Sequence, residues 1–72
     1  MTNAAAKLNA LWNAAGKTVT IDDGTGITAS RVIVSRRHCY GHALELTLSA
    51  PLPGQTSRLF TVDADNAWRV TA

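Results

Sequence analysis

The hydrophobic pattern of the chain changes its period at Gly16. Before this residue, four apolar residues recur at helical spacing and form one stripe: Leu8, Leu11, Trp12 and Ala15. After it, apolar and polar residues alternate in short runs, which is typical of strands with one buried face. The sequence therefore predicts an α+β domain, with a helix over 3–15 followed by a β-barrel or curved sheet over 17–72.

The predicted helix cannot stand alone. Alanine favours helix, but an isolated helix of this length is marginal in water. Thr2 or Asn3 can cap its first turn, and Gly16 can end it in a left-handed conformation. We expect the helix to dock on the β-region through Trp12.

Five strands are predicted after the helix, over 17–22, 27–36, 42–49, 58–63 and 67–71. The turns between them, such as Asp23-Gly24-Thr25-Gly26, are too short to hold a crossover helix, so the strands should pair antiparallel. The second run alternates imperfectly, which indicates a bend or bulge near Ser30 to Ile33. Such bends allow small barrels to close.

Alternation in two of the predicted strands indicates which side chains face the core, and it is most regular over 42–49. Leu44, Leu46 and Leu48 should point inward, with Glu45 and Thr47 outward. In the last strand Trp68 and Val70 should share one face. Both tryptophans, Trp12 and Trp68, then pack in or over the core. The alternative is that one of them is a hot spot for a partner.

The length and composition of the chain restrict what it can be. Seventy-two residues make one domain, over 1–72, with a thin core. Cys39 is the only cysteine, which excludes an internal disulfide and fits a reducing, cytoplasmic location. The apolar runs are too short to span a bilayer, and Lys7, Asn9 and Asn13 interrupt any signal-peptide core.

The order and spacing of these elements resemble those of the Sm-like and SH3-like small barrels. The stretch IDDGTGITASRVIVSRR is similar to the first hairpin of an Sm-like domain, where an Asp-Gly turn leads into a long, bent second strand. It is most similar to Rho-binding antiterminator proteins, with which it shares the helix, the DG turn and a Val-Ser-Arg element. That resemblance implies a five-stranded barrel that binds a larger protein and catalyses nothing.

The densest group of functional side chains lies at a predicted hairpin tip, in the run Arg36-Arg37-His38-Cys39-Tyr40-Gly41-His42. Arginines beside a tyrosine can hold phosphates while the ring stacks on a base, or can contact a partner protein. The structural alternative is a polar hairpin end. A second contact face would combine Trp68 and Arg69 with Arg58. The predicted binding residues are thus Arg36, Arg37, His38, Tyr40, His42, Arg58, Trp68 and Arg69.

Metal binding and catalysis are less well supported by the same residues. His38, Cys39 and His42 could chelate zinc, but a structural site needs four ligands and the chain has no other Cys or His. Cys39 and His38 are adjacent in a strand and point to opposite faces, so they form no catalytic dyad. We expect no metal, no cofactor and no enzymatic activity.

The prediction from sequence is a small binding module, regulatory or inhibitory, that docks on a larger protein or nucleoprotein machine. Five of the seven cationic side chains are arginine, whose guanidinium forks onto phosphates and carboxylates. The alternative is an RNA- or DNA-binding protein that uses Arg36, Arg37 and Tyr40. The open edge of the last strand offers a further surface, for a partner or for a second copy in a homo-oligomer. No membrane partner is expected.

Overall fold

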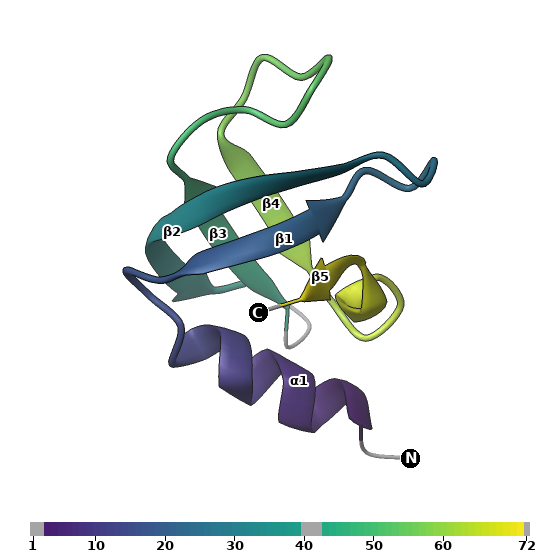
Figure 1. Ribbon diagram of the computed structural model, residues 1–72. Coiled ribbons are helices and arrows are strands. Elements are labelled where there is room, and N and C mark those ends of the chain that lie inside the picture. The colour runs from purple at the N-terminus through teal and green to yellow at the C-terminus, as the bar shows by residue number, and fades with distance from the viewer. Residues whose placement is uncertain (1–2, 40–42, 72) are drawn as a thin grey trace.

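The computed structural model describes residues 3–39 and 43–71, which form one helix and a five-stranded antiparallel sheet (Figure 1). The α+β prediction is confirmed. In chain order the elements are α1 (Asn3–Trp12), β1 (Thr18–Asp22), β2 (Thr28–His38), β3 (Leu44–Leu48), β4 (Leu59–Val62), the short 3₁₀ helix η2 (Ala67–Arg69) and β5 (Val70–Thr71).

The long strand β2 is the centre of the sheet, whose strand order is β4-β3-β2-β1-β5. Its first half pairs with β1 and its second half with β3. The register shifts between Ile33 and Ser35, so the predicted bulge exists but lies slightly later in the strand. Within the described residues no ladder joins β4 to β5, so the sheet is curved but not closed into a barrel.

The core lies on the concave side of this sheet. It is built from inward-facing aliphatic side chains of all five strands, of which the most deeply buried are Val19, Ile21, Ile33, Leu44, Leu46, Leu48, Val62 and Val70. The inward placement predicted for the three leucines of β3 is confirmed. Phe60 and Val62 share the buried face of β4, also as predicted.

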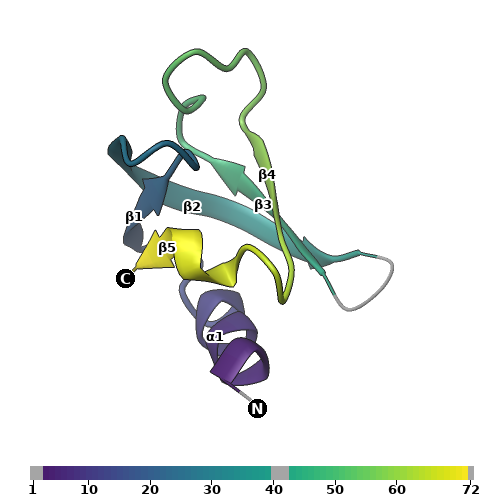
Figure 2. The same ribbon diagram turned by 90° about the vertical axis from the view of Figure 1, so that its right-hand side faces the viewer.

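Helix α1 lies below the sheet and packs against one end of it (Figures 1 and 2). It ends at Trp12, three residues before the predicted end. The Gly16 N–H donates to the Ile33 carbonyl over 2.7 Å, so the chain already pairs with β2 there and must leave the helix earlier. Gly16 has a φ of 86°, the left-handed conformation expected of it. Because of the earlier end, Ala14 and not Ala15 is buried.

The prediction of a fifth strand over 67–71 is wrong in its first half. Residues 67–69 form η2, and only Val70 and Thr71 pair with β1. The cause is the preceding turn, in which the Asp63 carboxylate accepts the N–H groups of Asp65 and Asn66 over 2.9 and 3.1 Å. The chain continues from this turn directly into η2, which directs the side chain of Trp68 outward. Trp68 is 62% exposed, whereas Val70 is fully buried. Trp68 therefore does not pack in the core.

The turn between β1 and β2 is held by two carboxylates, as its Asp-Gly sequence predicts. Asp22 Oδ1 accepts the N–H of Gly24 over 2.7 Å. Asp23 Oδ1 accepts the N–H and the hydroxyl of Thr25 over 2.8 and 2.6 Å. These bonds, the hydroxyl's above all, hold the pKa of Asp23 below its ordinary value of 3.8.

This lowered pKa makes a prediction for the pH dependence of stability. The stabilisation from the Asp23 carboxylate is fully present above the unfolded-state pKa near 3.8 and is lost as the pH falls through the lower folded-state pKa. We expect Asp23→Asn to lower the urea midpoint at neutral pH, and the two proteins to become equally stable once the Asp23 carboxyl of the wild type is protonated. The control is Asp65→Asn, since the Asp65 carboxylate accepts no hydrogen bond among the described residues. A difference between Asp23→Asn and wild type that persists unchanged in strong acid would contradict this assignment.

Candidate functional site

An aromatic stack between the half-buried Trp12 and the exposed His38 joins α1 to the end of β2. The Trp12 and His38 rings lie 4.3 Å apart between centroids and are inclined by only 14°. The guanidinium of Arg36 lies over the same indole, with its Cζ 4.2 Å from the ring centroid, and its Nε donates to the Trp12 carbonyl over 2.7 Å. Arg36 and His38 are two residues apart in a strand, so both side chains face the helix.

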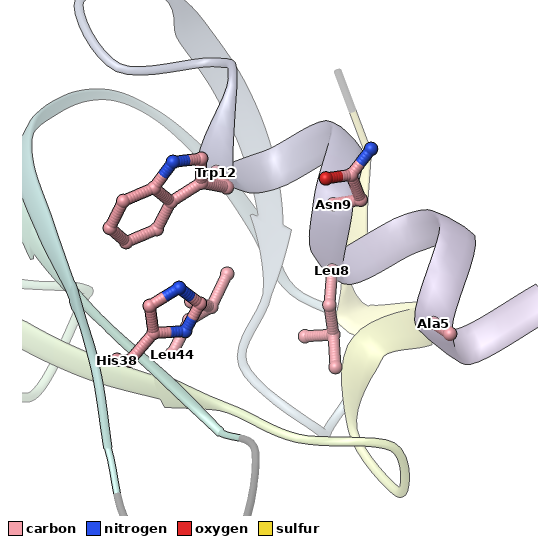
Figure 3. A pocket seen from close by; sticks show the side chains of 6 residues that line it. All are labelled: Ala5, Leu8, Asn9, Trp12, His38 and Leu44. Atoms are coloured by element: carbon pink, nitrogen blue, oxygen red, sulfur yellow. The ribbon is translucent and has the colours of Figure 1, made fainter.

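A groove opens beside this stack, between α1 and the end of the β2–β3 hairpin. Figure 3 shows His38 under the Trp12 indole, with Leu44 beside it and Leu8 across the gap. Its volume is about 380 Å³, and Ala5 and Asn9 of the helix complete the lining. The volume falls within the range of small-ligand pockets, about 300–1,000 Å³.

The groove is apolar with a few polar groups, and those are not acidic. Leu44 is buried, Leu8 and Trp12 are half-buried against the core, and His38 and Asn9 are exposed. Within residues 3–39 and 43–71, no carboxylate lines the groove and the imidazole of His38 makes no hydrogen bond. The side chain suited to this groove is therefore apolar, with a polar neighbour that can bond to the imidazole.

The predicted cluster over 36–42 is not a single surface. Arg36, Arg37 and His38 belong to β2 and not to the hairpin tip. Arg37 points to the opposite face from its two neighbours, where its Nε pairs with Glu45 Oε1 over 2.7 Å. Tyr40 and His42 lie outside the described residues.

The second predicted face is divided as well. Trp68 and Arg58 are exposed. Arg69 instead turns toward the β1–β2 turn, where its Nε donates to the Asp22 carbonyl over 2.6 Å. Its guanidinium lies over the Phe60 ring, with the Cζ 4.9 Å from the centroid.

Three of the arginines bind backbone carbonyls and thereby connect separate segments of the fold. Arg31 donates to the carbonyl of Pro51 through Nε and Nη2, over 3.1 and 2.8 Å, and so holds the loop after β3. Arg36 and Arg69 do the same for the end of α1 and for the β1–β2 turn. The sequence suggested recognition for these side chains, and nothing in their spacing revealed these carbonyl partners.

Two further observations concern metals and membranes. Within residues 3–39 and 43–71 no group of three or more His, Cys, Asp or Glu side chains is placed to hold a metal ion, and His42 lies outside that part of the chain. No helix in the same part is long and apolar enough to cross a membrane.

Comparisons with protein-family models, with curated protein sequences and with solved structures find no match to this chain.

Proposed function

We propose that this domain is a non-enzymatic binding module that holds an apolar side chain of a partner protein in the groove between α1 and the β2–β3 hairpin. The observation that carries the proposal is the Trp12–His38 stack, because it presents a large aromatic surface beside Leu8 and Leu44. Tryptophan is enriched among the residues that dominate binding energy at protein interfaces. The His38 imidazole, which makes no hydrogen bond among the described residues, adds a polar contact that can fix the orientation of the bound segment.

The charge around the groove indicates the kind of segment that fits. Arg36 lies over the indole, and α1 carries Lys7 and no acidic residue. Complementary charge across an interface speeds association and selects partners. We therefore propose that the bound segment combines an apolar anchor residue with nearby carboxylates.

The regulatory role proposed from sequence is consistent with this mode of binding. A domain of 72 residues that holds one side chain of a larger protein can block or redirect that protein without chemistry of its own. We also propose that the curved sheet is an open form of the small barrel that the sequence resembles, since β2 bends at its bulge and serves both halves of the sheet.

A displayed peptide library can test the proposal. The enriched peptides are expected to share an apolar residue flanked by Asp or Glu. Ala5→Glu places a carboxylate and a longer chain into the groove, so affinity for these peptides should fall about tenfold or more. The matched control is Ala6→Glu, because Ala6 is also exposed on α1 but does not line the groove. Equal binding by the two variants would place the site elsewhere, and no enrichment at all would reject the function.

Nucleic-acid binding is the second candidate, and the observation in its favour is the exposure of Arg37 and Arg58. Arg37 is 74% exposed in spite of its bond to Glu45. Single-stranded RNA or DNA should then bind at low salt, with an affinity that falls steeply as salt rises and falls further in Arg37→Ala with Arg58→Ala. Absence of binding even at low salt would exclude it.

A further inference from the structure

A second, smaller pocket lies between the β1–β2 turn, the β3–β4 loop and η2. Its volume is about 180 Å³, which is room for about six water molecules at about 30 Å³ each. Three of its lining residues are buried core side chains: Leu48, Leu52 and Phe60. It shares no lining residue with the groove beside α1, and its two loops lie on the side of the sheet away from the helix (Figure 2).

A fixed cation forms one part of this pocket. The Nε of Arg69 is held by the Asp22 carbonyl, and the Phe60 ring supports the guanidinium from below. Within the described residues neither Nη group makes a hydrogen bond, so both remain free for a ligand. A carboxylate is the group that two adjacent guanidinium N–H donors bind best.

A fixed anion forms another part. Asp23 also lines the pocket, and one of its oxygens is held by Thr25. The same bonds lower its pKa, so the side chain is ionised at neutral pH. No ion pair joins Asp23 to Arg69 among the described residues, but the Arg69 charge contributes to the lowered pKa of Asp23, so the two opposite charges lie near each other without direct contact.

This separation restricts the ligand. A simple anion would be attracted by Arg69 and repelled by Asp23, and a simple cation would meet the reverse. A molecule with both charges satisfies both residues, and an attached apolar group can cover Leu48, Leu52 and Phe60. We propose that this pocket binds a free α-amino acid with a small apolar side chain, of the size of valine or leucine. Its carboxylate would bond to Arg69, and its ammonium group would bond to Asp23.

The pocket proposal is independent of the function proposed for the groove, and ligand analogues test it without altering the protein. L-leucine is titrated into the ¹⁵N-labelled domain, and amide shifts are followed for residues around the pocket. Leucinamide lacks the carboxylate and 4-methylpentanoate lacks the ammonium group. Each is expected to bind about tenfold more weakly or worse, the factor that a charge-assisted bond supplies. Equal binding by either analogue would overturn the two-charge recognition, and no saturable shift with leucine would overturn the site.

A pair of variants locates the site. Asp23→Asn removes the charge but keeps an oxygen for Thr25, and we expect it to weaken leucine binding about tenfold. Asp65→Asn removes the same charge from a different turn and should leave binding unchanged. Amide spectra of both variants without ligand show whether the fold is retained. Equal affinity of the two variants for leucine would show that Asp23 makes no contact and would reject the proposal.

Discussion

Leu46→Ala is expected to lower the free energy of unfolding by about 2–5 kcal/mol, the cost of a cavity in a well-packed core. Leu46 lies in the middle of β3, is fully buried and pairs with Arg36 on one side and Phe60 on the other. A domain of 72 residues has a total stability of about 4–10 kcal/mol. The substitution should therefore remove about half of it, which urea denaturation followed by circular dichroism will measure.

The matched control is Leu59→Ala on the neighbouring strand β4. Leu59 is 53% exposed and faces away from the core, so its truncation should change stability by about 0.5 kcal/mol or less. If the two substitutions cost the same, the inward and outward faces assigned to this half of the sheet are wrong.

Trp12→Ala is expected to lower the free energy of unfolding by about 2–3 kcal/mol, somewhat less than a fully buried tryptophan would. The loss has three sources: the packing of Trp12 against the core, its stack with His38 and its contact with the Arg36 guanidinium. Together with the buried side chain of Leu11, these contacts hold the last turn of α1 on the sheet. We therefore expect faster amide exchange in α1 as well as a lower denaturation midpoint.

Trp68→Ala is the corresponding control, since Trp68 is the other tryptophan and is 62% exposed on η2. We expect a change in stability of about 0.5 kcal/mol or less and no change of exchange in α1. A large loss with Trp68→Ala, or none with Trp12→Ala, would mean that the helix is held by contacts other than the stack.

The sequence was a good guide wherever one local rule decides the structure. Strict alternation placed Leu44, Leu46 and Leu48 on the buried face of β3. The Asp-Gly turn after β1 also formed as predicted, because its carboxylates bond to nearby backbone N–H groups.

Other features depend on contacts between distant segments, which no local pattern contains. Trp68 alternates with Val70 in the sequence, yet the turn at 63–66 continues into η2 and exposes it. The groove lies where the end of α1 meets the part of β2 beyond its register shift, where Arg36 and His38 both contact the Trp12 ring. The end of α1 and the register shift both depend on how neighbouring segments pair with β2. That pairing joins residues that are distant in the sequence, so no local pattern predicts it.

The strand order has a consequence for how the domain assembles. The β1–β2, β2–β3 and β3–β4 ladders each join neighbours along the chain, so they close short loops and can form early. Strand β5 joins β1 through only two residue pairs, Thr20 with Thr71 and Ile21 with Val70. Forming the β1–β5 ladder must bring together the two ends of the β-region, and only two residue pairs stabilise it. A nascent chain would thus hold a four-stranded meander first, and the edge of β1 would stay open until Val70 and Thr71 have been synthesised.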